Sequence, residues 1–286
     1  MSPLAFVSLA WRAMLAVLLL LPVTTALTVC ALSNDKQRVY RFDGGSWTQI
    51  GGGADNIWGG PFGLVATNPG NSLAYLWNPS GGWRQIGSGG AEFVVTLGDV
   101  FGLSTGKDAI YKWIGGQTWQ QVGGGAMHIY GGNGGKLIAT TPLNTEAYLY
   151  LGNPNSWKKI GDGGRQFVSG EDGRIYALGG DGTAVWIYLP NSNTWSQIGG
   201  GAARIWSNKI RLYASSPQET SIYGFDPGYS VWYNEGGGGR DWAAEGNRLF
   251  GLTPNGGEVF VKVNEVWSSI GAPSGSGGLL KLQICP

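Results

Sequence analysis

The stretch WTQIGGGA, residues 47–54, recurs with small changes along the whole chain. Each copy begins at a tryptophan, continues as a short β-like run and ends in a cluster of glycines. The copies begin 35 to 38 residues apart, at Trp47, Trp83, Trp119, Trp157, Trp195, Trp232 and Trp267. A fixed period of this length is the signature of a repeat architecture, in which each repeat is one supersecondary unit.

Between consecutive tryptophans lie three further strand-like pieces, such as RQFVSG, RIYALGG and AVWIYLP before Trp195. Each repeat therefore predicts four short strands. A sheet of this size cannot bury both of its faces alone, and radial stacking on copies of itself solves that problem. Seven markers predict an all-β protein, a seven-bladed β-propeller of four-stranded blades.

The two ends of the chain begin and finish within a repeat. LTVCALS (27–33) and RVYRFDG (38–44) resemble the second and third strands of a unit, whereas GGLLKLQICP (277–286) resembles a first, innermost strand. Pairing of the N- and C-terminal strands would close the ring and cover both sheet edges. This pairing places Cys30 and Cys285 on neighbouring strands, within reach of a disulfide. The alternative is two buried free thiols.

Composition argues against several functional classes. The chain has a formal net charge of +1, one histidine and two cysteines. It lacks the clustered basic residues with which proteins bind nucleic acid or anionic membranes. Metal sites usually take several His or Cys ligands, and His128 alone leaves one candidate base for a nucleophile. We therefore expect no metal, no cofactor and no enzymatic activity.

The first 26 residues have the pattern of a secretory signal peptide. Arg12 precedes the apolar run Met14–Val23, and the small residues Thr24, Thr25 and Ala26 precede a predicted cut before Leu27. The apolar run is too short to span a bilayer, so no membrane insertion is expected. The sequence thus predicts residues 1–26 as the signal peptide and 27–286 as a single propeller domain, secreted into an oxidising compartment.

The repeat W-x-x-I-G-G-G, followed by a β run, Gly-Gly and an Ile-Tyr strand, resembles the tectonin and tachylectin-like repeats of propeller lectins. The resemblance covers residues 31–286. It implies a secreted, multivalent carbohydrate-binding protein without catalysis, whose partners are cell-surface or microbial glycans, including lipopolysaccharide and glycoproteins.

Three rings occur only in some repeats and are our candidate ligand-binding residues. Trp58, Tyr130 and Trp206 stand at equivalent places in the first strand of alternate units, each two residues after a polar residue, at Asn56, His128 and Arg204. An aromatic face, nearby polar groups and small neighbours suit a sugar. The alternative is that these rings pack between blades, the role that we also assign to the seven repeat tryptophans.

Two functions from different classes remain open. The equivalent placement of the three rings favours a lectin with repeated sites. The alternative is a secreted protein–protein interaction scaffold, an effector or inhibitor that binds no sugar, since propellers host both roles. A hydrolase in the central channel ranks third and would need a pair of carboxylates there.

Overall fold

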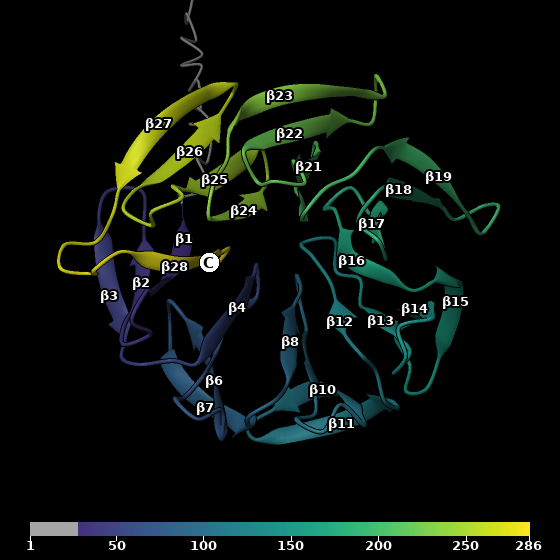
Figure 1. Ribbon diagram of the computed structural model, residues 1–286. Coiled ribbons are helices and arrows are strands. Elements are labelled where there is room, and N and C mark those ends of the chain that lie inside the picture. The colour runs from purple at the N-terminus through teal and green to yellow at the C-terminus, as the bar shows by residue number, and fades with distance from the viewer. Residues whose placement is uncertain (1–27) are drawn as a thin grey trace, which may run out of the picture.

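The structure, a computed structural model, describes residues 28–286, and every regular element in that range is a β-strand. No helix there is long and apolar enough to cross a membrane. The strands form seven four-stranded antiparallel sheets arranged as blades around a central axis (Figure 1). The prediction of a seven-bladed β-propeller is confirmed. The predicted signal peptide, 1–26, and Leu27 lie outside the described residues.

We number the blades I to VII in chain order and give the strands of each from the axis outward. Blade I contains β28 (Leu279–Gln283), β1 (Val29–Ser33), β2 (Val39–Phe42) and β3 (Trp47–Gly51). Blade II contains β4 (Asn56–Gly60), β5 (Gly63–Thr67), β6 (Leu73–Asn78) and β7 (Gly82–Ser88). Blade III contains β8 (Glu92–Val95), β9 (Val100–Leu103), β10 (Ile110–Gly115) and β11 (Thr118–Gly123). Blades IV and V contain β12 (Ile129–Tyr130), β13 (Ile138–Thr140), β14 (Glu146–Tyr150) and β15 (Trp157–Asp162); and β16 (Gly164–Ser169), β17 (Ile175–Gly179), β18 (Val185–Leu189) and β19 (Thr194–Gly199). Blades VI and VII contain β20 (Ile205–Ser207), β21 (Leu212–Ser215), β22 (Ser221–Asp226) and β23 (Val231–Gly237); and β24 (Asp241–Glu245), β25 (Arg248–Leu252), β26 (Val259–Val263) and β27 (Val266–Gly271).

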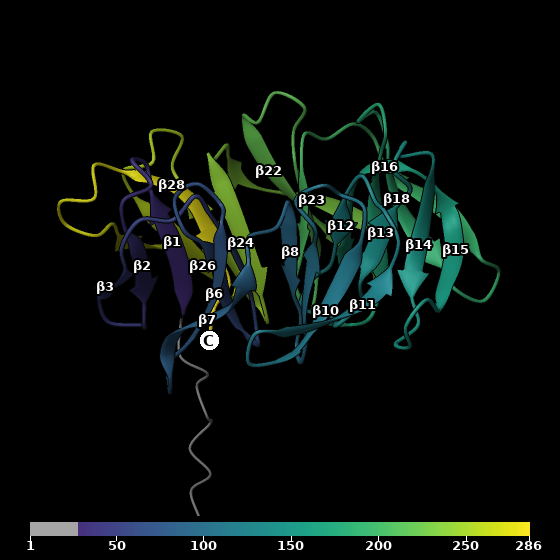
Figure 2. The ribbon, with the colours of Figure 1, turned by 90° about the horizontal axis from the view of Figure 1, so that it is seen from below.

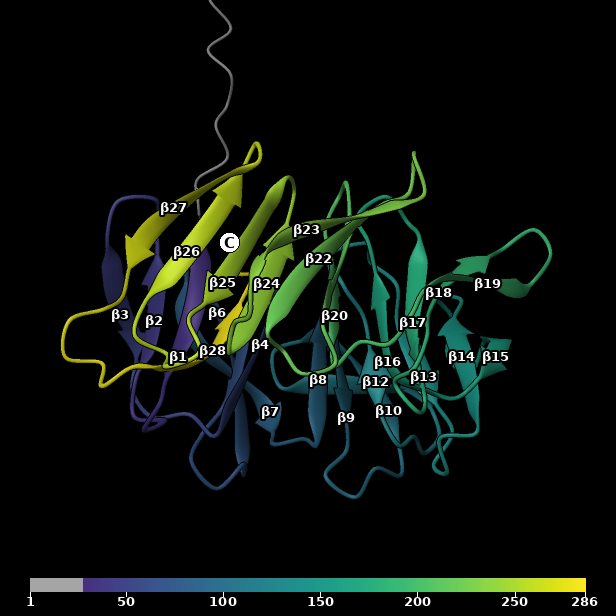
Figure 3. The same cartoon turned by 45° about the horizontal axis from the view of Figure 1, so that its top comes forward.

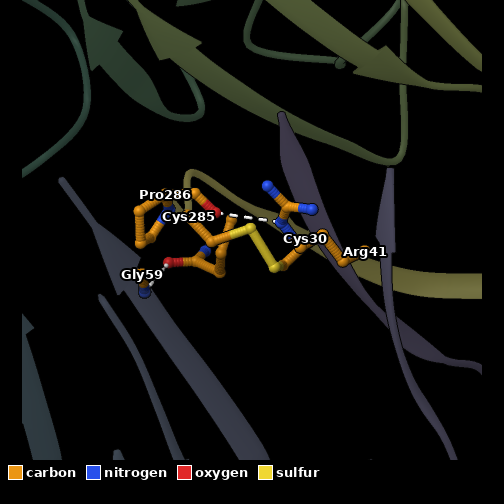
Figure 4. Close-up of a disulfide and its surroundings, with 6 residues drawn as sticks. Cys30, Arg41, Gly59, Cys285 and Pro286 are labelled. Carbon is orange, nitrogen blue, oxygen red and sulfur yellow. Dashed lines mark hydrogen bonds between the residues drawn. A yellow bond between two sulfur atoms is a disulfide. The ribbon is translucent and has the colours of Figure 1, made fainter. Parts of the chain in front are cut away.

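The ring closes in blade I, where the C-terminal strand β28 pairs with β1. A disulfide joins Cys30 to Cys285 across a sequence separation of 255 residues, as predicted (Figure 4). Next to it, the Arg41 guanidinium Nε donates a hydrogen bond of 2.9 Å to the carbonyl of Pro286. The last residues of the chain are therefore held both covalently and by hydrogen bonds.

The two faces of the ring carry different connections. We call the face with the segments that link one blade to the next, such as residues 52–55, the upper face. The lower face carries the C-terminus (Figure 2). Figure 3 shows β24 and β25 of blade VII beside β28, so blade VII packs against the strand that closes blade I.

One row of side chains crosses every blade in the same order: a large apolar residue, a small residue, an aromatic residue and a polar residue. In blade III these are Phe93, Gly102, Tyr111 and Gln121, which pair successively across the strands. Directly paired residues share one face of a sheet. The small second-strand residues are Ala31, Ala66, Gly102, Ala139, Ala177, Ala214 and Gly251, and the aromatic third-strand residues are Tyr40, Tyr75, Tyr111, Tyr148, Trp186, Tyr223 and Phe260.

The seven repeat tryptophans join neighbouring blades. In the outermost strand of each blade, one residue is left out of the pairing at a β-bulge, as Ile50 is between Gln49 and Gly51. Its carbonyl accepts the indole N–H of the next blade's repeat tryptophan. All seven bonds form, at 2.6–3.0 Å, including Trp47 to Ile270 across the closure. The predicted packing role of these tryptophans is therefore confirmed.

The glycine after the bulge is required by this contact. A Cβ at Gly161 would lie 2.6 Å from the Trp195 indole nitrogen, and the φ of Gly161 is +155°. A side chain there would strain the backbone and displace the indole. A Cβ would make the same close contact at Gly51, Gly87, Gly123 and Gly199, so the indole explains the first glycine after the bulge in blades I to V.

Candidate functional site

The three candidate rings lie on innermost strands and point toward the following blade. Their centroids lie 5.1 Å (Trp58–Phe93), 5.4 Å (Tyr130–Phe167) and 6.4 Å (Trp206–Trp242) from the first-strand ring of that blade. Those rings in turn meet the repeat tryptophans Trp119, Trp195 and Trp267 at 6.0–6.1 Å. Three equivalent aromatic stacks thus run outward between blades.

Polar neighbours surround the same rings. The Lys281 Nζ lies 5.5 Å from the ring centroid of Trp58, and the guanidinium of Arg204 lies 5.0 Å from that of Trp206. The His128 ring is 5.8 Å from Tyr130. Burial, with a contribution from the Glu92 carboxylate, raises the pKa of Tyr130. Cations in this position interact favourably with aromatic faces.

The polar residues that precede the buried apolar position of each first strand form a belt around the axis. The belt consists of Lys281, Asn56, Glu92, His128, Gln166, Arg204 and Asp241. Lys281 donates to Asn56 at 2.9 Å, Glu92 contacts His128 Nδ1 at 2.5 Å, and Arg204 donates to Asp241 at 3.0 Å.

Three belt residues also bind the backbone of the next blade. Glu92, Gln166 and Asp241 accept the N–H groups of Ile129, Ile205 and Leu282 at 2.8–2.9 Å. Burial raises the pKa of Asp241 and lowers that of Lys281. The belt residues thus differ between repeats because they bind different partners in the next blade: a side chain for Lys281, Glu92 and Arg204, and a backbone N–H for Glu92, Gln166 and Asp241.

The structure therefore brings Trp58, Tyr130, Trp206, Asn56, His128 and Arg204 into interblade contacts near the axis. Their assignment as ligand-binding residues stays a prediction. Open concave surface lies elsewhere, in clefts between the blades.

The cleft between blades II and III has a volume of about 430 Å³. Blade II contributes Gln85 and the glycines of residues 87–90, and blade III contributes the rings of Phe93, Tyr111 and Trp119. Hydroxyl and amide groups of Ser104 and Gln117 complete the lining. Rings, backbone and uncharged polar side chains thus converge on one concave surface.

Three further clefts repeat this arrangement at equivalent positions. Their volumes are about 200 Å³ between blades I and II, 250 Å³ between V and VI, and 290 Å³ between VI and VII. Each combines the glycine cluster of one blade with the third-strand aromatic residue and the repeat tryptophan of the next: Tyr75 with Trp83, Tyr223 with Trp232, and Phe260 with Trp267.

These clefts were not predicted from the sequence. The repeat tryptophans were expected only to pack between blades, although four of them also line a cleft, and the third-strand ring had no predicted role. A signal was present, because an aromatic residue occupies that place in all seven repeats. Its meaning depends on the neighbouring blade, which contributes the opposite wall.

A pair of carboxylates lies on the lower side of the channel. Glu171 accepts the backbone N–H of Gly246 at 2.6 Å, and Asn133 donates to the Ala244 carbonyl at 3.0 Å, so loops of blades IV, V and VII meet there. Burial, and secondly the Glu171 charge, raises the pKa of Glu245 to about 7. A pair of this kind is what the third-ranked function, a hydrolase in the central channel, would need, so that alternative stays a prediction. Neither carboxylate lines any of the four clefts.

The half-buried carboxylate of Glu245 predicts a pH-dependent stability. Its folded-state pKa of about 7 exceeds the ordinary value of 4.5, so the folded protein holds a proton more tightly, and stability is lost as pH rises from 4.5 to 7. The Glu245→Gln variant should lack this loss, which we expect to be about 2 kcal/mol. Urea unfolding of both proteins at pH 5 and pH 8 measures it. Parallel pH profiles would contradict the prediction.

Among residues 28–286, no group of three or more His, Cys, Asp or Glu side chains could hold a metal ion. The polar chemistry available in the clefts is that of hydroxyl, amide and backbone groups.

The sequence matches no family model and no curated protein. Solved propellers do resemble the fold. AztD from Citrobacter koseri aligns with a TM-score of 0.66 at 10% identity, covering 91% of this chain and 98% of that one. A streptogramin B lyase aligns with a TM-score of 0.57 at 12% identity, covering 80% and 86%. YCF48 bound to D1 peptide aligns with a TM-score of 0.50 at 13% identity, covering 84% and 91%. At these identities the likeness concerns the propeller fold alone.

Proposed function

We propose that this protein is a multivalent carbohydrate-binding protein, a lectin of the tectonin-like kind, secreted and without catalytic activity. The observation that carries the proposal is the repetition of one cleft at four interblade positions, each with an aromatic ring, a repeat tryptophan, glycine backbone and uncharged polar groups. Sugars present C–H faces to rings and hydroxyls to amide and backbone groups.

Several shallow sites on one rigid ring favour clustered ligands. All four clefts include glycines of the segments that link blades, so they open toward the upper face. A surface dense in glycans would engage several of them at once, and avidity exceeds the affinity of any single site. We expect weak binding of free monosaccharide and much tighter binding of immobilised polysaccharide.

The cleft rings supply the test of this function. We expect the variant Tyr75→Ala, Tyr111→Ala, Tyr223→Ala, Phe260→Ala to lose at least tenfold of its binding to immobilised glycans, because each site loses a stacking surface. The measurement is a glycan array with bacterial and methylated sugars, followed by surface plasmon resonance on the glycans that are bound.

Two controls make the result specific. The variant Tyr111→Phe, Tyr223→Phe retains the rings and should retain most of the binding. The variant Trp58→Ala, Tyr130→Ala, Trp206→Ala tests the inner-strand residues. If a folded inner-strand variant loses binding while the cleft variant keeps it, the sugar sites lie near the axis and the clefts are not the sites.

The second candidate is a protein-interaction scaffold. Large apolar side chains stand exposed at hairpins that lie on the lower side, with Tyr229 78% and Leu97 70% exposed. The similar propeller YCF48 is known in a structure with a peptide. An array without signal for the folded protein would favour this function, and the lower face would then be the surface to mutate.

A further inference from the structure

The clefts share a property that limits what they can bind: none of the residues that line the four of them carries a charge. In the largest, between blades II and III, the side-chain polar groups include the amides of Gln85 and Gln117 and the hydroxyls of Ser104, Thr105 and Tyr111. Amide and hydroxyl groups can both donate a hydrogen bond to a neutral hydroxyl and accept one from it.

Three cations near the clefts on the upper face have partners. Lys36, beside the cleft of blades I and II, lies 3.2 Å from Asp55. Arg204 contacts Glu219 at 2.7 Å on the side of blade VI that faces blade VII. Lys107 donates to the Met127 carbonyl at 2.8 Å, away from the cleft of blades II and III. A ligand carboxylate would have to compete with these partners for Lys36, Arg204 and Lys107.

An anionic group in these clefts would be poorly compensated. It would exchange water for aromatic rings, glycine backbone and neutral side chains, and an ion moved out of water without a counter-charge is strongly destabilised. A neutral pyranose has no such penalty, and its apolar face fits the rings.

We propose that the interblade clefts select uncharged saccharide residues and discriminate against sialic acids, uronic acids and sulfated or phosphorylated sugars. This inference rests on the proposed carbohydrate-binding function and narrows it: phosphate-bearing parts of lipopolysaccharide would not be the recognised element, whereas neutral sugars would be.

The test uses the full protein and pairs of array glycans that differ only in the terminal residue, neutral in one member and sialic, uronic or sulfated in the other. We expect at least tenfold tighter binding of the neutral members. Equal or tighter binding of the acidic members would overturn the inference while leaving the lectin function standing. Absence of binding to either set would instead remove the proposed function, and the inference with it.

A variant with an added positive charge tests whether the cleft lining or the net charge of the protein sets the preference for neutral sugars. Gln117→Lys adds a cation to the largest of the four clefts. Gln120→Lys adds the same charge three residues later, on β11, outside the cleft. We expect Gln117→Lys to reduce the neutral-over-acidic preference at least threefold relative to Gln120→Lys. An equal shift in both variants would show that net charge, not the cleft lining, sets the preference, and would overturn the inference.

Discussion

Removal of the disulfide by Cys30→Ala and Cys285→Ala is expected to lower the free energy of unfolding by about 5 kcal/mol. The bond closes a loop of 255 residues, nearly all of the described chain. In the loop-entropy view, a crosslink over so long a segment restricts the unfolded ensemble strongly. Urea unfolding of wild type and double variant measures the difference.

The structure also predicts where the variant opens first. Strand β28 is held to blade I by the disulfide, by its pairing with β1 and by the bond from Arg41 to Pro286. Hydrogen exchange should therefore accelerate more in β28 than in β24, the equivalent strand of blade VII. Wild type under reducing conditions should reproduce the result. A change in stability below about 1 kcal/mol would show that pairing of β28 alone closes the ring.

The second large loss of stability is expected when an indole hydrogen bond between two blades is removed. Trp195→Ala should destabilise the fold by about 4 kcal/mol, because it removes a large packed ring and leaves the Ile160 carbonyl without its donor. Trp195→Phe, which retains much of the ring but not the N–H, should cost about 2 kcal/mol. Thermal unfolding with a two-state fit measures both.

Trp113→Phe is the matched control for these variants. The Trp113 indole donates to the Gly116 carbonyl within its own hairpin, not to a neighbouring blade. We expect its loss to cost less than about 1 kcal/mol. If Trp113→Phe and Trp195→Phe destabilise the protein equally, the interblade bond has no special weight and the ring is held by apolar packing alone.

A tryptophan that forms one of these interblade hydrogen bonds can also line a cleft. Trp119 both donates to the Ile86 carbonyl and lines the cleft between blades II and III. One residue type at one repeat position thus fixes the spacing of two blades and supplies part of the surface between them. This dual use explains why cleft variants are best made at the third-strand rings, which take no part in the interblade bonds.

The sequence alone determined the architecture, because the relevant signals are local and periodic. The seven repeats of WTQIGGGA and its variants gave the number of blades, and the incomplete repeats at the two ends gave the closure and the disulfide of Cys30 with Cys285. The apolar first-strand residues Ile57 and Phe93 are both buried, as the period of two along a strand requires when the residues on either side of them face the other way.

Only the tertiary structure decided where the concave surfaces lie and which side chains are already engaged. The sequence left open whether Trp58, Tyr130 and Trp206 bind a ligand or pack between blades, and in the structure they lie against rings of the next blade. The cleft walls come from two blades, and the belt charges match only across blade boundaries. Burial, pairing and the raised pKa of Glu245 depend on how neighbouring blades are oriented through space, and a period along the chain does not specify that orientation.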